Sequence, residues 1–392
     1  MEEWKEYKLG EVCSRLRSGK GIKADSVFEI GRFPVIGGNG VRGYTNISNF
    51  SGQAAIIGRQ GAYCGNVRYF EGEAYMTEHA VVVVGNELAD TYYLSCYLSL
   101  MHLGNLSAQS AQPGISVQTL SKQIVRLPSK PEQQRIAAIL KSLDDKIEVN
   151  RKINENLEQQ AQALFKSWFV DFEPFKDGEF VESELGMIPQ GWKAGTLEDI
   201  CIQSSQKVGR RNDVKVLSPV TTGELVLSED YFTKQVFSES LAKYRVVKKG
   251  SFAYNPARVN IGSLGRNEFD FDGAVSPVYV VFECKEGYGN YFDLFRKTDK
   301  FKSEVLSRAI GGVRQSLNYV DFSMIQAIIA PKEVVDSFNP LIENIKALKN
   351  HIQDESLCLA ALRDTLLPRL MSGELNVQNT DLINEMLEKG IR

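Results

Sequence analysis

The chain has 392 residues, of which 43% are hydrophobic and 24% are charged, and its net charge is −3. This composition excludes a disordered chain, and the length allows two globular domains, each with its own core. Apolar runs such as Ala80–Val84 are far too short to span a membrane, and no basic segment followed by an apolar one opens the chain, so we expect neither a membrane anchor nor a secretion signal.

The charge distribution and the cysteines indicate which partners and which compartment are compatible with this chain. Lys+Arg against Asp+Glu number 13 to 11 in residues 1–130, 7 to 12 in 131–185, 19 to 16 in 186–330 and 7 to 10 in 331–392. A small basic excess forms a basic face only if its charges cluster, so a nucleic-acid surface and a mixed solvated surface both stay open. Six scattered cysteines without a C-x-x-C pair favour reduced thiols in a cytoplasmic protein over a zinc site.

Residues 1–130 are predicted to form a first domain of mixed strands and helices. Ala80–Val84 has the pattern of a buried strand, and residues 92–103 have helical spacing with Asp90 as the N-cap. The stretch Ser107–Gly114 is predicted as a loop and Ile124–Pro128 as the last strand.

The stretch GGNGVRGY at 37–44 fits the spacing G-x-G-x-x-G through Gly38, Gly40 and Gly43. A dinucleotide-binding loop of this kind needs a strand before it and a helix opening at its end, where helix N–H groups meet the pyrophosphate. Phe33–Ile36 suits the strand, but Tyr44–Asn49 is polar and turn-forming and makes a poor helix. We therefore interpret these glycines as residues that allow tight turns.

Two long helices are predicted, one at 131–170 and one at 332–373. In both, apolar residues recur mostly in steps of three and four. The second runs from about Asp336 to Leu367, with Pro340 tolerable only near its start and Pro368 ending it. Spacing by seven over four heptads is typical of a coiled coil, and the predicted seam consists of Ile136, Leu143, Asn150, Leu157, Leu164, Phe338, Ile345, Ile352, Leu359 and Leu366.

These helices are expected to pack against each other. Because the connection between them runs through a whole domain, the second can return antiparallel to the first. Asn150 interrupts the seam, and a polar residue at such a position lowers stability but fixes the register. The alternative is that each helix packs only on its own domain as an amphipathic helix.

Three further segments complete the chain. Residues 171–190 are acidic and punctuated by Pro and Gly, which predicts an ordered, turn-rich linker. The second domain, 191–331, is predicted to contain a strand at Val278–Phe282, a helix at Tyr291–Ala309, a loop at Gly311–Gly312 and a strand at Met324–Ala330. The tail, 374–392, is polar and is expected to be a small cap or a flexible end.

The two halves of the chain repeat each other. Trp4, Lys5, Leu9 and Cys13 recur as Trp192, Lys193, Leu197 and Cys201, at a constant offset of 188 residues. The two halves of the helix seam correspond at an offset of 202, so the second copy holds about fourteen more residues in its globular part. Two matches in the same order indicate a duplication and an approximate two-fold repeat. The predicted fold is therefore α+β, with two similar α/β domains separated by two long helices that form an antiparallel coiled coil.

No pattern in the sequence indicates catalysis. Asn255-Pro256-Ala257 after Tyr254 is a weak match to the Asn-Pro-Pro-aromatic loop of amino-group DNA methyltransferases, without the second Pro, the aromatic residue or a cofactor-binding glycine motif. Glu78–His79 is the one acid–base pair that stands out, and a structural histidine is the more common case. We find no nucleophile elbow, Walker loop or cluster of acids with metal-ligand spacing.

Basic, amide and aromatic residues in loops point instead to DNA. Arg and Lys can recognise guanine edges, Asn and Gln adenine edges, and further cations can hold phosphates. Any one of them could equally be a solvated surface group. The candidates are Arg15, Arg17, Lys20, Lys23, Arg42, Tyr44, Arg59, Arg68, Gln109 and Gln112 in the first copy and Lys207, Arg210, Arg211, Lys215, Arg258, Asn260, Arg266, Arg314, Gln315 and Asn318 in the second.

Several stretches resemble one protein family. The segment from Pro131 to Ala137 (PEQQRIA), followed by the heptad helix and residues 164–172 (LFKSWFVDF), resembles the central conserved region of type I restriction-modification specificity subunits. Residues 185–192 (LGMIPQGW) are similar to the opening of their second target recognition domain, and 362–375 (LRDTLLPRLMSGEL) to their distal conserved end. Val41-Arg42-Gly43-Tyr44 resembles a loop common in the recognition domains.

The resemblance implies a non-catalytic subunit that recognises an asymmetric, bipartite double-stranded DNA sequence. Its partners would be two methyltransferase subunits bound at the coiled coil and two motor-nuclease restriction subunits. No cofactor is expected on this chain, whereas S-adenosylmethionine, ATP and Mg²⁺ are expected on the partners. Residues that contact bases vary within the family, so the candidates above depend on their chemistry alone.

Two other functions stay open. A stand-alone DNA methyltransferase that uses Tyr254–Ala257 would bind its cofactor as an isolated chain. A coiled-coil scaffold without DNA preference would bind duplex DNA weakly and without the steep salt dependence that phosphate contacts cause.

Overall fold

The computed structural model describes residues 4–107, 114–211, 214–232, 237–238, 240–309 and 316–375. The chain forms two compact units, unit 1 from Met1–Lys152 with Ile352–Arg392 and unit 2 from Ile153–His351. Each unit contains one globular domain and part of both long helices. Among the described residues, no helix is long and apolar enough to cross a membrane.

A six-stranded sheet forms the centre of unit 1. Its order is β2-β7-β5-β6-β3-β4, and neighbouring strands are antiparallel except for β3 and β6. The strands are β2 (Cys13–Ser18), β7 (Ala80–Gly85), β5 (Phe50–Gly58), β6 (Val67–Met76), β3 (Phe33–Gly37) and β4 (Gly40–Thr45). Around it lie β1 (Lys5–Lys8) paired with β8 (Ile124–Leu127), helices α1 (Thr91–Leu100) and α2 (Val117–Ser121), and the 3-10 turns η1 (Leu9–Glu11), η2 (Ala24–Ser26) and η3 (Leu103–Leu106).

The two faces of this sheet have different surroundings. Residues directly opposite each other on neighbouring strands lie on the same face. Val83, Ala55 and Tyr69 are opposite one another and belong to the core that includes residues of the long helices. Val82 and Ile56 lie on the other face, which we call the outer face, in a separate apolar cluster with Ile36, Ala54 and Met76.

Unit 2 contains two four-stranded sheets. The first has the order β12-β19-β16-β17, with β12 (Cys201–Ser204), β19 (Val280–Cys284), β16 (Phe252–Tyr254) and β17 (Leu264–Arg266). The second has the order β14-β13-β18-β15, with β14 (Leu225–Leu227), β13 (Lys215–Pro219), β18 (Gly273–Val275) and β15 (Arg245–Val247). The other elements are β11 (Lys193–Thr196) paired with β20 (Gln326–Ile329), α4 (Ser228–Tyr231), α5 (Gly289–Phe295), α6 (Asp299–Arg308), α7 (Tyr319–Ser323), η5 (Leu197–Asp199) and η6 (Val259–Ile261).

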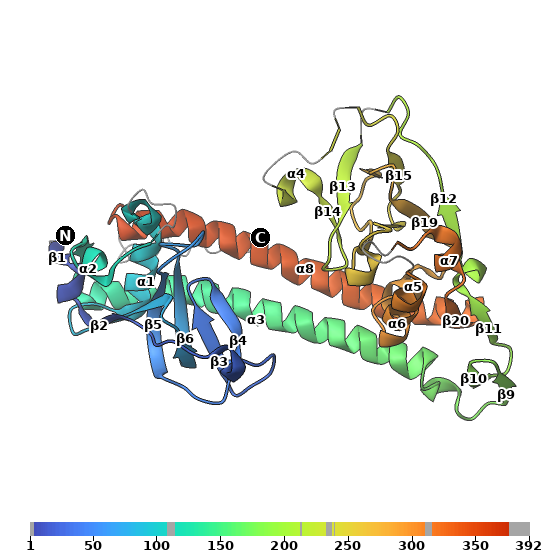
Figure 1. Ribbon diagram of the computed structural model, residues 1–392, viewed down its shortest axis with the longest axis horizontal. Coiled ribbons are helices and arrows are strands. Elements are labelled where there is room, and N and C mark those ends of the chain that lie inside the picture. The colour runs from blue at the N-terminus through green and yellow to red at the C-terminus, as the bar shows by residue number, and fades with distance from the viewer. Residues whose placement is uncertain are drawn as a thin grey trace. The chain divides into compact units, whose positions relative to one another are not determined.

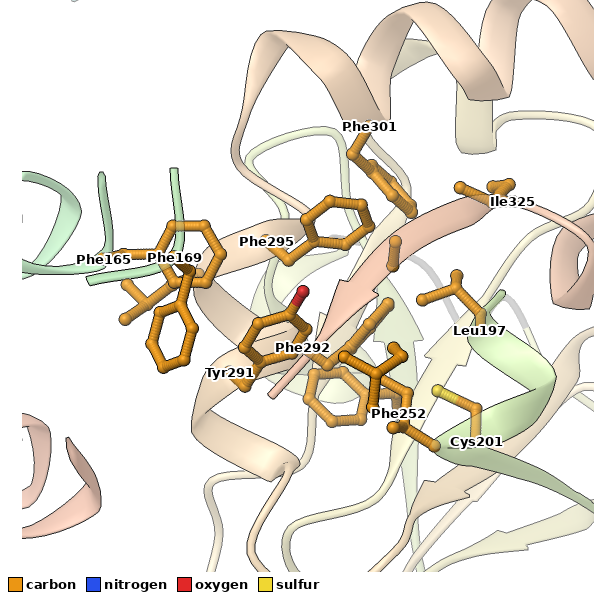
Figure 2. Packing of buried hydrophobic residues seen from close by; sticks show 14 of the residues in the cluster. Phe165, Phe169, Leu197, Cys201, Phe252, Tyr291, Phe292, Phe295, Phe301 and Ile325 are labelled. Carbon is orange, nitrogen blue, oxygen red and sulfur yellow. The ribbon is translucent and has the colours of Figure 1, made fainter. Parts of the chain in front are cut away.

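Aromatic rings fill the core of unit 2. Phe252 and Phe282 stack across neighbouring strands with ring centroids 5.3 Å apart, and Phe292 of α5 meets both rings edge-on. Figure 2 shows Phe252, Tyr291, Phe292 and Phe295 with Phe165 and Phe169 of the first long helix in the same packed cluster. Such edge-to-face contacts add to the free energy of burial, so this core fixes the sheet, α5 and the helix as one body.

The long helices are α3 (Lys130–Phe169) and α8 (Lys332–Met371), which occupy the two segments predicted to be long helices (Figure 1). In unit 1 the early residues of α3, such as Ile136 and Leu143, share a core with late residues of α8, such as Leu366. In unit 2 the end of α3 meets the start of α8, since Phe169 and Phe338 have ring centroids 4.8 Å apart. The helices therefore pair antiparallel, as expected.

All ten predicted seam positions are buried or half-buried. Asn150 is 1% exposed, and its Nδ2 donates to Glu355 Oε2 at 2.6 Å and to Ser356 Oγ at 3.2 Å on α8. A buried amide with partners on the facing helix favours one register, because a shifted register would leave it unpaired.

The repeat extends to secondary structure. Elements η1 and η5 correspond at the offset of 188, and α2, β8 and α3 correspond to α7, β20 and α8 at the offset of 202. In unit 2, strand β18 of the second sheet lies between β17 and β19 of the first sheet in sequence. In unit 1 one continuous strand, β6, occupies the corresponding part of the chain.

Several predicted helix boundaries are wrong, and α1, predicted over residues 92–103, ends at Leu100. Helix α8 starts at Lys332, so Pro340 lies well inside it, and it continues through Pro368 to Met371. Val335 at the start and Leu370 at the end are 0% exposed, and their burial outweighs the hydrogen bonds that the prolines remove. The helix predicted at 291–309 is two helices, because Thr298 caps α6 by accepting a hydrogen bond from Phe301 N.

The predicted linker is ordered. After α3 the chain forms the 3-10 turn η4 (Glu173–Phe175) and a hairpin of β9 (Phe180–Ser183) and β10 (Gly186–Pro189). Trp192 packs edge-on against Phe172 and Phe175, which fixes this segment on unit 2. The predicted tail lies outside the described residues from 376 onward.

Candidate nucleic-acid interface

Loops converge at one end of the sheet in unit 1. Arg59 N donates to His79 O at 2.9 Å, Lys20 N donates to Met76 O at 2.9 Å, and Ile115 N donates to Arg59 O at 3.0 Å. A Cβ at Gly38 would lie 3.0 Å from His79 O, so the β3–β4 turn also belongs to this end. We call these segments, 19–21, 38–40, 58–60, 77–79 and 114–115, rim 1.

Rim 1 carries several predicted DNA contacts. Lys20 is exposed and Arg59 is half-buried. Arg68, at the start of β6, donates from Nη2 to Asn39 Oδ1 at 3.0 Å in the β3–β4 turn. The structure thus brings Lys20, Arg59 and Arg68 together with an amide that the sequence reasoning passed over. Asn39 stands inside GGNGVRGY, and the signal for it is its position between two glycines of a hairpin turn.

The glycine stretch itself is the β3–β4 hairpin. Gly37 pairs with Gly40, and no helix follows β4, which excludes the geometry of a dinucleotide loop here. Gly40 has φ +103°, which an L side chain rarely adopts. The prediction of a tight turn therefore holds for Gly38 and Gly40, whereas Gly43 lies inside strand β4.

Arg17 also lies on the outer face of the sheet. It is opposite Val82, which is opposite Ile56, which is opposite Arg68, so both arginines flank one row of buried side chains. Arg15 lies one pair further along, with its guanidinium 5.1 Å from the ring centroid of Phe50. Burial, together with the charge of Arg17, lowers the pKa of Arg15.

The remaining candidates of unit 1 are dispersed. Lys23 is exposed near η2, and Arg42 and Tyr44 are exposed on the edge strand β4. Edge strands leave such side chains accessible, so these positions are compatible with backbone contacts to DNA but do not form part of rim 1. Gln109 and Gln112 lie outside the described residues.

Unit 2 has an equivalent rim. Leu317 N donates to Pro256 O at 3.1 Å, as Ile115 N donates to Arg59 O in unit 1. Arg245 Nε donates to Pro277 O at 3.1 Å. We call the segments 255–258, 276–279 and 317–318 rim 2, and Arg258 is its exposed predicted cation.

More cations of unit 2 gather at its second sheet. Lys207 and Arg210 are exposed, and Lys207 forms a bridge with Arg245 beside β15. Arg211 forms an ion pair with Asp272 at 3.1 Å, and Lys215 lies 5.3 Å from the ring centroid of Phe271. Arg245, which donates to Pro277 of rim 2, is a cation that the sequence reasoning missed. Nothing in its sequence neighbours distinguishes it from other arginines.

Two candidates of unit 2 have structural partners. The side chain of Arg266 is 16% exposed, and its guanidinium donates to Asn290 Oδ1 at 2.8 Å and to Gly250 O at 3.3 Å on the helix side of the sheet. Asn318 caps α7 by accepting from Asp321 N at 2.9 Å. Arg266 is therefore not part of rim 2, whereas Asn318 lies in it but uses its side chain to cap α7. Asn260 lies half-buried in η6, and Arg314 and Gln315 are outside the described residues.

Known proteins similar to this chain carry one common description. Residues 1–159 match the family model of the type I restriction modification DNA specificity domain. The MjaIX specificity subunit of Methanocaldococcus jannaschii is 30% identical over 295 residues, 71% of this chain and 66% of that protein. The HindI specificity subunit of Haemophilus influenzae is 24% identical over 466 aligned residues, 96% of this chain and 100% of that protein. The chain belongs to the type I restriction-modification specificity subunit family.

Two further similarities concern the length of chain that is aligned and the fold. The EcoprrI specificity subunit of Escherichia coli is 39% identical over 146 residues, but these are 36% of this chain and 36% of that protein. Alignments with the MjaIX and EcoprrI relatives thus span just under two thirds and about one third of their lengths. The crystal structure of the S subunit from M. genitalium covers 94% of this chain and 96% of its own at 15% identity, with a TM-score of 0.58, and so shares the fold.

The residues considered for catalysis lie in surroundings that are typical of structural residues. Tyr254 is 0% exposed in the aromatic core, and burial raises its pKa. Asn255 Oδ1 accepts from Ala257 N at 3.1 Å, which closes a local turn. His79 Nε2 and Glu78 Oε1 are 3.2 Å apart with both side chains more than 40% exposed, the arrangement of a surface pair. Within the described residues, no group of His, Cys, Asp or Glu could hold a metal ion.

Proposed function

We propose that this chain is the DNA-specificity subunit of a type I restriction-modification complex and that it recognises an asymmetric, two-part DNA sequence. The domain of unit 1 would recognise one half-site and the domain of unit 2 the other. The chain itself performs no catalysis and selects the DNA on which partner subunits act.

One observation carries the proposal. The same skeleton occurs twice, and its equivalent loop ends, rim 1 and rim 2, present different cationic and amide side chains. A symmetric pair of identical domains would favour a palindromic target, because each would select the same bases. Two related but unlike rims favour two unlike half-sites.

Charge chemistry supports DNA as the ligand. Exposed Lys20, Arg17, Lys207, Arg210 and Arg258 are suited to phosphate oxygens, which position a protein on the duplex. Arginine and amide side chains at the rims are suited to base edges, where each good bidentate contact gives about 1–3 kcal/mol of discrimination. The overall charge of −3 does not oppose this, since the acidic excess lies in residues 131–185 and 331–392.

We further propose that two methyltransferase subunits bind this chain and methylate adenine with S-adenosylmethionine, and that two restriction subunits supply ATP- and Mg²⁺-dependent translocation and cleavage. The protein would act in the cytoplasm, where the DNA and these partners are found. The methyltransferase subunits would bind at the paired helices α3 and α8.

Co-expression with the methyltransferase subunit in a host free of DNA methylation tests the proposal. Genome-wide detection of modified adenine should then reveal one split motif with unlike halves, and the methyltransferase subunit alone should give none. A continuous motif, a palindromic motif or no modification would contradict the proposal.

Two simpler measurements separate the alternatives. A stand-alone methyltransferase would bind S-adenosylmethionine as the isolated chain, which we expect not to occur. A scaffold without DNA preference would show little or no binding to duplex DNA at any salt concentration. We expect binding by the complex whose affinity falls steeply with salt, because phosphate contacts release counterions.

A further inference from the structure

Arg68 is held in a defined orientation at rim 1. Its Nη2 donates to Asn39 Oδ1 at 3.0 Å, and its Nη1 lies 3.1 Å from the point where a Cβ on Gly40 would stand. Gly40 thus lets the guanidinium lie close to the hairpin backbone, and Asn39 fixes it from the side. The side chain itself is exposed. An exposed arginine that is already oriented loses less entropy when it forms a directional contact.

The chemistry of this contact leaves the arginine free to bind a ligand. A guanidinium has five N–H donors in a planar fork, and one of them is used by Asn39. The partner is a neutral amide, so the positive charge is not compensated, and no carboxylate in the described part of the chain forms an ion pair with Arg68. The remaining donors match the O6 and N7 acceptors of guanine, which lie side by side in the major groove.

The strand register keeps acids away from this arginine. Side chains of a strand alternate between faces, so Glu71, three residues after Arg68 on β6, lies on the opposite face. There its Oε2 is 3.5 Å from Lys141 Nζ on α3. On the outer face, Arg68 shares its row with Arg17, and the local charge is positive.

Unit 2 lacks this arrangement. The row equivalent to Arg17–Val82–Ile56–Arg68 runs through Ser204, Val281, Ala253 and Gly265. A Cβ on Gly265 would lie 2.4 Å from Glu224 C, because the segment before β14 covers this position. No side chain fits where unit 1 has Arg68, so this recognition element belongs to one domain.

We propose that Arg68 recognises a guanine in the half-site of unit 1 through O6 and N7, and that Asn39 is the residue that positions its guanidinium. This inference depends on the proposed function, and it assigns one base of the target to one side chain. Asn39 contributes geometry, and Arg68 makes the contact.

The test uses the chain in complex with its methyltransferase subunit. Methylation rates are measured on short duplexes in which each base pair of the wild-type motif is replaced in turn. With R68A and R68K, discrimination for guanine at one position of one half-site should fall by roughly 5- to 140-fold, since lysine keeps the charge but not the planar fork. N39A should reduce the discrimination for guanine at the same position by a smaller factor. N39D, which keeps an acceptor for the same N–H, should retain the guanine preference while methylating all duplexes more slowly.

The matched control is Arg32→Ala. Arg32 is an exposed arginine just before β3, with its guanidinium 4.9 Å from the ring centroid of Phe33, and its removal should leave the motif unchanged. Thermal unfolding of each variant establishes that it is folded, and the second half-motif serves as an internal standard in the same duplexes.

Three results would overturn the inference. These are an unchanged motif with R68A, an equal loss of rate on every duplex, which marks a phosphate contact, and a change confined to the other half-motif. Each of them leaves the proposed function intact, because the wild-type complex still yields a split motif. If the wild-type complex yields no motif, the proposed function fails first.

Discussion

The central sheets of the two units differ most on the face turned away from the long helices. In unit 1 the row through Val82 and Ile56 ends in Arg17 and Arg68, whereas the equivalent row of unit 2 ends in Ser204 and Gly265. In unit 2 a second sheet packs on this face, with Leu217 and Val275 in one cluster with Ala253 and Val281. The helix side is similar in both. Divergence after the duplication is thus concentrated on the outer face and at the rims.

The largest effect should come from the aromatic core that distinguishes unit 2. Phe338 is 0% exposed and contacts Phe169 and Trp168, so F338A should lower the free energy of unfolding of unit 2 by about 3–5 kcal/mol. The corresponding I136A in unit 1 removes fewer buried atoms and should cost less. Urea unfolding followed by tryptophan fluorescence checks this, since Trp168 and Trp192 belong to unit 2 and Trp4 to unit 1. Equal losses would mean that the two cores are equivalent.

A buried ion pair should make unit 2 sensitive to acid. Burial alone would raise the pKa of Asp293, but the charges of Arg296, Lys346 and Lys297 outweigh it and hold that pKa well below its usual range. The stability this group contributes is therefore present above its unfolded pKa of about 3.9 and is lost as the pH falls below it. D293N should remove this pH dependence and cost about 3 kcal/mol at neutral pH, because Arg296, 10% exposed, would lose its partner.

The control for D293N is D144N in unit 1. Asp144 also accepts from an arginine, Arg363 Nη1 at 2.9 Å, but its side chain is 38% exposed. Water can replace this partner, so the loss should stay at or below about 1 kcal/mol. Unfolding measured from neutral pH to about pH 3 compares the variants. A larger loss for D144N than for D293N would contradict the assignment of the buried pair.

A buried amide ties α3 to the first domain, where the second copy has an apolar residue. Gln133 is 0% exposed, donates to Leu88 O and Pro128 O at 2.9 and 3.0 Å and accepts from Asp90 N at 2.9 Å. The residue 202 positions later is Val335, also 0% exposed. Q133V should cost about 2 kcal/mol because it leaves buried backbone groups unpaired. Thermal unfolding checks this, and an unchanged midpoint would show that water satisfies those groups.

The smallest expected effect is an increase in stability. Ile352 occupies the seam position that corresponds to Asn150, and the structure leaves Asn150 Oδ1 buried without a hydrogen bond. N150I should therefore raise the free energy of unfolding by about 1 kcal/mol while loosening the register that the amide specifies. Calorimetry checks the gain. A lower midpoint would mean that the contacts with Glu355 and Ser356 stabilise the pair more than an apolar side chain does.

The periodicity of the apolar residues and the internal repeat predicted much of the fold. Heptad spacing predicted α3 and α8 as long helices, and the offsets of 188 and 202 recur in the elements themselves. The ends of α8 were predicted wrongly at the prolines. The low helix propensity of Pro340 and Pro368 is outweighed by the burial of Val335 and Leu370. The second sheet of unit 2 could not be foreseen, since its strands of three to five residues leave a weak pattern.

The candidate site was less predictable than the fold. Arg68 and Arg266 look alike in sequence, yet one is exposed at rim 1 and the other is 16% exposed beside Asn290. What separates them is the strand register, which determines the face on which a side chain lies and which a single sequence does not encode locally. Asn39 and Arg245 were missed for the same reason, because their roles depend on partners distant in sequence.

Exchange of the globular domain of unit 1 tests whether the two domains recognise separate half-sites. Residues 4–127 are replaced by the equivalent domain of another family member, and modified adenines are mapped with the same methyltransferase subunit. We expect one half of the motif to change to a new sequence while the other half stays as it is in the wild type. If both halves change, or if neither does, the two domains do not recognise separate half-sites, and the account is contradicted.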